Sequence, residues 1–180
     1  MEKQKNIFIG GAAKSGKSTI AEKICKNKRY NHIPLDYFTA SLKRNFPDVG
    51  IRSNVLIEGE TSPKLALLVS TVFNIINDTE EKFIIDSAHI MPKDLIKYID
   101  KDKWDILYIG YPNVNAKDKF NLIRKLEHDF SWTHRRTDEE LFPMIEKLIE
   151  ISKEIERQCK ELNITFIDTS GDINEVLNKL

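Results

Sequence analysis

The chain has 180 residues, and its 28 lysines and arginines balance its 28 aspartates and glutamates. The length suits one domain over residues 1–180, and the balanced charge argues against partners such as nucleic acid or a membrane surface. No apolar run approaches the ~20 residues needed to cross a bilayer, and no charged-then-apolar leader opens the chain. Cys25 and Cys159 stand far apart without a metal-ligand spacing. We therefore expect a reduced, cytoplasmic protein with buried thiols.

Short apolar stretches alternate along the chain with longer segments of helical periodicity. Strands are predicted over residues 6–9, 32–35, 82–86, 105–109 and 164–167. Helices are predicted over residues 17–27, 37–45, 62–77, 93–99, 116–130, 138–162 and 173–180. This alternation is typical of an α/β fold, in which helices cover both faces of an open parallel sheet.

Two of the predicted helices have distinctive features. Thr137 and Glu140 match a capping box at the start of 138–162, whereas Pro143 either delays the regular helix or kinks its first turns. The helix over 62–77 is apolar on nearly every side, so it is either enclosed by the fold or pairs with a second subunit. A monomer and a homodimer both remain open.

The first predicted strand leads directly into a phosphate-loop pattern, G-x-x-x-x-G-K-[ST]. Its fixed positions are Gly11, Gly16, Lys17 and Ser18. Glycines allow a tight turn around an anion, backbone N–H groups point at phosphate oxygens, and the lysine adds positive charge, while the serine hydroxyl suits Mg²⁺. The nucleotide-binding residues are therefore predicted to be Gly11, Ala12, Ala13, Lys14, Ser15, Gly16, Lys17, Ser18 and Thr19.

Carboxylates follow the next two predicted strands, where ligands of open α/β sheets gather. Asp36, in an acceptor-side segment 36–63, could orient a substrate hydroxyl and take its proton, or it could simply cap a helix. Asp86 ends the third strand, where phosphate-loop enzymes place the acid that orients Mg²⁺. His89 follows closely, and such a histidine is more often a packed residue than a catalytic one.

A basic segment, residues 111–137, follows the fourth predicted strand. Phosphoryl transfer needs cations around the moving group, and the guanidinium fork suits phosphate oxygens. We therefore predict that Arg124, Arg135 and Arg136 belong to a catalytic lid over the nucleotide. The alternative is a solvated basic face that neighbouring acids balance, and the pattern does not indicate which arginine contacts phosphate.

Taken together, these motifs resemble the nucleoside-monophosphate (adenylate) kinase-like group of phosphate-loop small-molecule kinases. The resemblance includes the phosphate loop, Asp36, Asp86, the arginine-bearing segments and the final residues 166–170. It implies a three-layer α/β/α fold with a five-stranded parallel sheet in the order 2-3-1-4-5. It also implies that Mg²⁺ and ATP are bound, that ATP donates its terminal phosphoryl group to a small-molecule acceptor, and that the backbone at Ser170 and Gly171 meets the adenine.

One stretch departs from that group and affects the substrate. Residues 87–92, Ser-Ala-His-Ile-Met-Pro, stand where monophosphate kinases carry a Gly-Phe-Pro-Arg-like stretch, and they resemble 2-phosphoglycerate kinase-like proteins instead. An acceptor other than a nucleoside monophosphate is therefore favoured, although the sequence does not identify it. Two alternatives remain: a nucleotide-binding ATPase or switch without a metabolite acceptor, and a toxin-like kinase.

Overall fold

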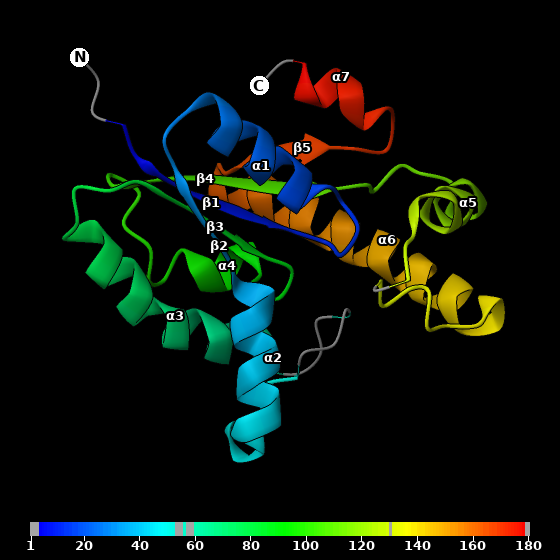
Figure 1. Ribbon diagram of the computed structural model, residues 1–180, viewed down its shortest axis with the longest axis horizontal. Helices are drawn as coiled ribbons and strands as arrows, with labels where there is room; N and C mark the ends of the chain where they lie inside the picture. Colours follow the sequence, from blue (N-terminus) through cyan, green and yellow to red (C-terminus); the bar gives the residue numbers. More distant parts are fainter. Residues whose placement is uncertain (1–3, 53–55, 57–59, 130, 179–180) are drawn as a thin grey trace.

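A five-stranded parallel sheet in the order β2-β3-β1-β4-β5 forms the centre of the molecule (Figure 1). The computed structural model describes residues 4–52, 56, 60–129 and 131–178. The strands are β1 (Asn6–Gly11), β2 (Asn31–Pro34), β3 (Phe83–Ser87), β4 (Trp104–Gly110) and β5 (Thr165–Asp168). The predicted α/β class and the strand order implied by the family resemblance are both confirmed.

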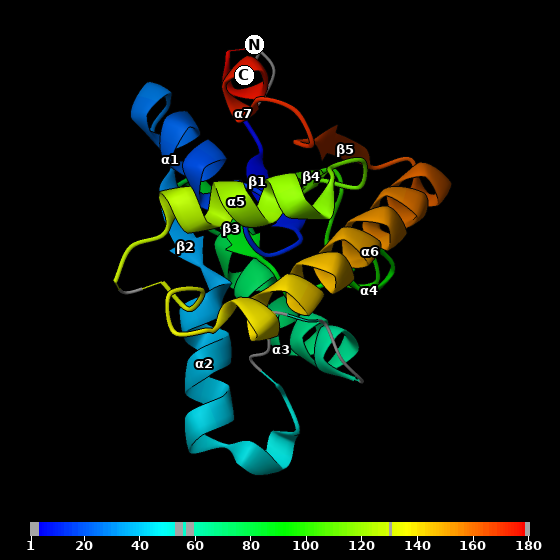
Figure 2. The ribbon, with the colours of Figure 1, turned by 90° about the vertical axis from the view of Figure 1, so that its right-hand side faces the viewer.

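Helices cover both faces of this sheet, which gives the expected three layers. The helices are α1 (Lys17–Asn27), α2 (Leu35–Asn45), α3 (Thr61–Asn77), α4 (Pro92–Leu95), α5 (Ala116–Leu126), α6 (Asp138–Leu162) and α7 (Ile173–Leu177), with a short 3-10 helix at Pro47–Val49. In Figure 1, α1 and α7 lie on one side of the sheet, and α3, α4 and α6 lie on the other. Figure 2 faces the end of the sheet where β1 enters the phosphate loop, and α5 crosses this end.

Side chains of β1 alternate between two apolar cores. Phe8 packs with Phe73 of α3 in an edge-to-face pair whose ring centroids are 6.1 Å apart. Ile7 and Ile9 point to the opposite face and pack with Ile20 of α1. Because both faces of the strand are buried, its sequence is an unbroken apolar run rather than an alternating one.

Several predicted element ends shift by a few residues. Leu35 begins α2 instead of ending a strand, because Pro34 has no N–H to continue the ladder. The predicted helix 93–99 contains only one α-helical turn, α4, and continues as a turn. Helix α5 ends at Leu126, where Glu127 takes an extended conformation; the predicted end at Phe130 lies outside the described residues. In the described part of the C-terminal segment, α7 ends at Leu177.

The capping box of α6 is confirmed. Thr137 Oγ1 accepts a hydrogen bond from the Glu140 N–H (3.3 Å), and a Glu140 carboxylate oxygen accepts one from the Thr137 N–H (3.1 Å). The helix is continuous from Asp138 with Pro143 inside it. The alternative in which Pro143 delays the helix is therefore wrong.

Helix α3 is buried on one face and apolar but exposed on part of the other. Leu65, Val69 and Phe73 are fully buried against the sheet, whereas Leu67 and Ile75 are exposed. The fold thus encloses only one side of this apolar helix. Both cysteines are free thiols, Cys159 buried and Cys25 half-buried, and no described helix combines the length and apolar character needed to span a membrane.

Candidate nucleotide and phosphoryl-transfer site

The phosphate-loop pattern lies between β1 and α1, the context that this motif requires. Gly11 and Gly16 have positive φ angles of 143° and 95°. A Cβ atom at Gly11 would lie 2.0 Å from the Ile109 carbonyl oxygen, and one at Gly16 would lie 2.2 Å from the Ile173 side chain. Both the backbone conformation and the surrounding space therefore require glycine at these two positions.

Side chains donate hydrogen bonds to four consecutive carbonyl groups of this loop. The four carbonyls of residues 12–15 accept hydrogen bonds, in order, from Lys17 Nζ (2.8 Å), Tyr111 OH (2.7 Å), Lys119 Nζ (3.0 Å) and Thr169 Oγ1 (3.2 Å). In a trans peptide the N–H points away from the carbonyl, so the N–H groups of the loop are left to face an anion.

Two further features of the loop fit a phosphate. Ser15 Oγ is buried and has no hydrogen-bond partner among the described residues, and such a hydroxyl needs one. Lys17 is also buried; burial lowers its pKa, and the charges of Asp36 and Asp86 oppose that effect. A phosphate oxygen would supply the acceptor that Ser15 lacks and the negative charge that a buried lysine requires.

The two groups expected to organise Mg²⁺ lie together. Ser18 Oγ is 3.5 Å from Asp86 Oδ2, and His32 Nε2, from the edge strand β2, is 2.7 Å from the same oxygen. The described residues contain no cluster of three or more histidine, cysteine or acidic side chains suited to a metal ion. This arrangement suits Mg²⁺, which usually binds through one or two protein ligands, waters and substrate phosphates. The sequence pattern did not indicate His32.

Asp36 and His89 form a pair on the acceptor side of the loop. His89 Nδ1 lies 3.2 Å from Asp36 Oδ1; the histidine is buried, and the aspartate side chain is 54% exposed. Burial raises the pKa of Asp36, but the His89 hydrogen bond, the charges of His89 and Lys17, and the Ala88 backbone together lower it overall. The residue before α2 is Pro34, and no side chain caps that helix, so Asp36 is not its N-cap.

One cavity of about 460 Å³ unites the phosphate loop with this pair. Its lining contains loop and α1 residues 13–19, together with Asp36, Ala88, His89, His128 and Trp132. No arginine is among the described residues that line it. The lid segment therefore contributes an imidazole and an indole here, in place of the expected guanidinium groups.

Arg124 is bound within the lid itself. Its guanidinium donates hydrogen bonds to the Glu127 carboxylate, to the Asp138 carboxylate, and to the carbonyl oxygens of Thr133 and Arg136, at 2.6–3.1 Å. These contacts connect the end of α5 to the start of α6. In this structure Arg124 thus organises the lid, and it does not point into the cavity as the sequence interpretation expected.

The other two lid arginines are exposed. Arg136 lies 3.5 Å from Glu140, a neighbour on the first turn of α6, and both side chains are about half exposed. Arg135 is also exposed. Neither residue lines the cavity, so the structure does not bring them together with the phosphate loop.

A second cavity, of about 640 Å³, adjoins the other side of the loop. Lys119 and Leu122 of α5 lie on one wall, and Gly171 and Ile173 lie on another. Gly171 thus lines a cavity next to the phosphate loop, and its contact with adenine stays a prediction. Ser170, in contrast, is not among the described residues that line this cavity, and its N–H and hydroxyl both donate to Asp168 Oδ1 within the turn.

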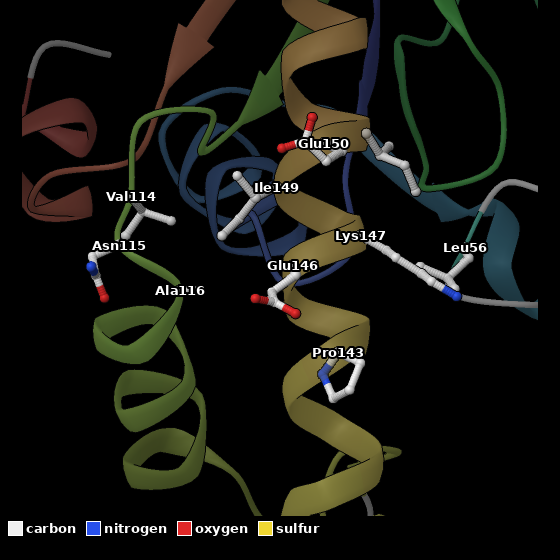
Figure 3. A pocket seen from close by; sticks show the side chains of 10 residues that line it. Leu56, Val114, Asn115, Ala116, Pro143, Glu146, Lys147, Ile149 and Glu150 are labelled. Carbon is white, nitrogen blue, oxygen red and sulfur yellow. The ribbon is translucent and has the colours of Figure 1, made fainter.

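A larger groove of about 760 Å³ lies between α6 and the start of α5, and several of its apolar residues pack in one cluster with Ala12 and Ala13 of the loop. Figure 3 shows Glu146 and Ile149 on the side of α6 that faces Val114, and Lys147 on the opposite side, toward Leu56. None of the described residues that line this groove belongs to the phosphate loop, to the Ser18–Asp86 pair or to the Asp36–His89 pair.

Small-molecule kinases are among the solved structures with a similar fold. The shikimate kinase of Bacteroides thetaiotaomicron is similar over 97% of this chain and 95% of its own, with a TM-score of 0.61 and 13% identity. A gluconokinase from Sinorhizobium meliloti 1021 is similar over 99% and 90%, with a TM-score of 0.60 and 15% identity. A shikimate kinase from Acinetobacter baumannii, in complex with shikimate, covers 99% and 91%, with a TM-score of 0.59 and 13% identity.

Comparisons of sequence gave no such relatives: no protein-family model and no curated protein matches the chain. At 13–15% identity, the structural similarity concerns the fold and not the substrate. The chain has the fold of the phosphate-loop small-molecule kinases.

Proposed function

We propose that this protein is an ATP- and Mg²⁺-dependent phosphotransferase, which moves the terminal phosphoryl group of ATP to a hydroxyl group of a small molecule. The observation that carries the proposal is the shared cavity, in which the phosphate loop and Lys17 face Asp36 and His89. A nucleotide switch needs only the first half of that arrangement. The second half, an ionised and accessible carboxylate, is what an acceptor hydroxyl needs.

On the donor side, the loop N–H groups and Lys17 would hold the phosphates, and Ser18 and Asp86 would hold Mg²⁺. When bound, Mg-ATP supplies the phosphoryl group, and its metal neutralises charge on the phosphate oxygens. His32 fixes the Asp86 carboxylate through a 2.7 Å contact. The backbone near Gly171, with the α5 wall of the second cavity, is our candidate for the adenine.

On the acceptor side, Asp36 would orient the hydroxyl group and accept its proton as the new oxygen–phosphorus bond forms. His89 positions the Asp36 carboxylate. The pKa of Asp36 is lowered overall, so this carboxylate is ionised at neutral pH. Arg135 and Arg136 could reach the transferring group only through a movement of the lid, and we assign them this role as a proposal.

Hydroxylated carboxylic acids are the first acceptors to test. Shikimate kinase and gluconokinase are named for compounds of this class. The described lining of the cavity contains an aspartate and two histidines, which can bind the hydroxyl groups of such an acceptor, and two lysines, Lys14 and Lys17, whose charge suits anionic groups.

The test is a coupled ADP-release screen over hydroxy acids, sugars, nucleosides, nucleotides and aminoglycosides. We expect an acceptor to stimulate ADP release by the wild type, and Lys17→Ala to abolish it without loss of the fold. Lys26→Ala is the matched control, because Lys26 is exposed in the last turn of the same helix. Asp36→Asn should still bind Mg-ADP but lose acceptor-dependent release.

Undiminished turnover in Lys17→Ala would contradict the proposal. Mg-ATP binding with no acceptor-dependent ADP release across the whole panel would favour a nucleotide switch instead. Growth inhibition on expression that requires Asp36 would favour a toxin-like kinase.

A further inference from the structure

Lys119 is a buried lysine directly behind the phosphate loop, outside the phosphate-loop motif. It lies on α5, and its residue exposure is only 7%. Its ammonium group donates to the Lys14 carbonyl (3.0 Å) and lies 3.9 Å from the centroid of the Tyr111 ring. The ring face attracts a cation, so both contacts stabilise the charged form and hold it in place.

The peptide that Lys119 holds is an unusual one. Lys14 has a φ angle of 59°, in the left-handed region that residues other than glycine seldom adopt. In this conformation the Lys14 carbonyl meets Lys119 of α5, and in a trans peptide the following N–H points the opposite way. A donor fixed on the outside of the loop therefore supports a backbone arrangement that is locally unfavourable.

Lys119 also adds positive charge close to the loop. Burial and, to a smaller extent, the charges of Lys14 and Lys17 together lower its pKa to about 8. Tyr111 faces it from the end of β4, and Asp172 lines the same cavity from the loop before α7. Mutual repulsion among three ammonium groups is relieved when a polyanion binds between them.

We propose that Lys119 is a positioning residue of the nucleotide site: it holds the Lys14 carbonyl outward, keeps the loop N–H groups turned toward the phosphates, and adds a third lysine charge behind them. The inference rests on the nucleotide site of the proposed function, and it does not depend on phosphoryl transfer or on the acceptor. A bound phosphate chain favours the charged ammonium, so nucleotide binding should draw a proton onto Lys119 where it is partly neutral.

Calorimetric titration with Mg-ADP in buffers of different ionisation enthalpy tests this directly. At about pH 8.5 the wild type should take up protons on binding, and at about pH 6.5 it should not, because Lys119 is then already charged. Lys119→Met should weaken Mg-ADP binding roughly tenfold to a hundredfold and reduce the proton uptake. Lys119→Arg keeps a permanent charge, so it should bind more tightly than Lys119→Met and without uptake at this residue.

Lys117→Met is the matched control, since it removes the same charge from the same helix while Lys117 contacts the Phe120 ring and not the loop. Equal Mg-ADP affinity and equal proton uptake in Lys119→Met and Lys117→Met would overturn the inference. If Lys119→Met does not fold, Lys119→Arg decides, and Mg-ADP affinity and proton uptake at the higher pH that both equal those of the wild type overturn the inference. Failure of the wild type to bind Mg-ADP would overturn the nucleotide site as well.

Discussion

Two buried tyrosines near the end of β4 support opposite halves of the proposed active site. The Tyr111 hydroxyl donates to the carbonyl of Ala13, in the phosphate loop, at 2.7 Å. The Tyr108 hydroxyl donates to the carbonyl of Ile90, next to His89, at 3.0 Å. Both side chains are fully buried, and burial raises the pKa of each phenol, so both remain neutral donors throughout the ordinary pH range.

Replacing either tyrosine by phenylalanine should destabilise the fold to a similar extent. Tyr111→Phe and Tyr108→Phe each retain the ring and its packing but leave one buried carbonyl without its donor. Such a group costs ~1–3 kcal/mol. Urea unfolding should therefore show a lower midpoint with an unchanged slope for both variants, because the surface exposed on unfolding stays the same.

The two variants should differ in function. Tyr111→Phe releases a carbonyl of the phosphate loop, so Mg-ADP should bind more weakly. Tyr108→Phe disturbs the segment that carries His89, so Mg-ADP affinity should be retained while acceptor-dependent turnover falls. An unchanged urea midpoint for Tyr111→Phe, or equal losses of Mg-ADP affinity in the two variants, would refute this reasoning.

Two further predictions concern Lys119 and Arg124. The pKa of Lys119 falls from the ordinary 10.5 to about 8, and each unit of pKa is worth ~1.4 kcal/mol. Between about pH 8 and pH 10.5 the unfolded chain holds a proton that the folded chain has lost. As the pH increases through this interval, the unfolding free energy of the wild type should therefore rise by up to ~3 kcal/mol relative to that of Lys119→Met. Urea unfolding of both proteins at the two ends of the interval measures this change, and a pH-independent difference between them would contradict the prediction. Arg124→Met should lower the melting temperature by loosening the lid, whereas Arg135→Met, at an exposed lid position, should not; equal melting temperatures of the two variants would argue against the lid network.

Local pattern was sufficient for the fold and for much of the proposed donor site. The apolar run of β1, the glycines at 11 and 16, and the periodicity of α1 are adjacent in the chain, so they were readable without tertiary information. Asp36 and Asp86 could be selected because parallel strands end at one edge of a sheet. Their partners, His89 and His32, required the actual side-chain geometry.

The residues that hold the phosphate-loop carbonyls could not be identified in the same way. Tyr111, Lys119 and Thr169 are about 100 or more positions away from the carbonyls that they bind. Nothing in their local sequence distinguishes them from an ordinary strand-end aromatic, a helix lysine and a turn threonine. Their role follows only from the order of strands, which places β4 beside β1 and β5 beside β4.

The lid arginines show why residue type alone does not assign a role. Arg124, Arg135 and Arg136 carry the same guanidinium group in one basic segment, and phosphate and carboxylate compete for it on similar terms. Arg124 has Glu127 and Asp138 within hydrogen-bond distance and also donates to two lid carbonyls, so its donors are engaged before any nucleotide arrives. To bind phosphate it would have to break the contacts that join α5 to α6. Arg135 and Arg136 face no comparable loss, so our proposal assigns the phosphate-binding role in a closed lid to them.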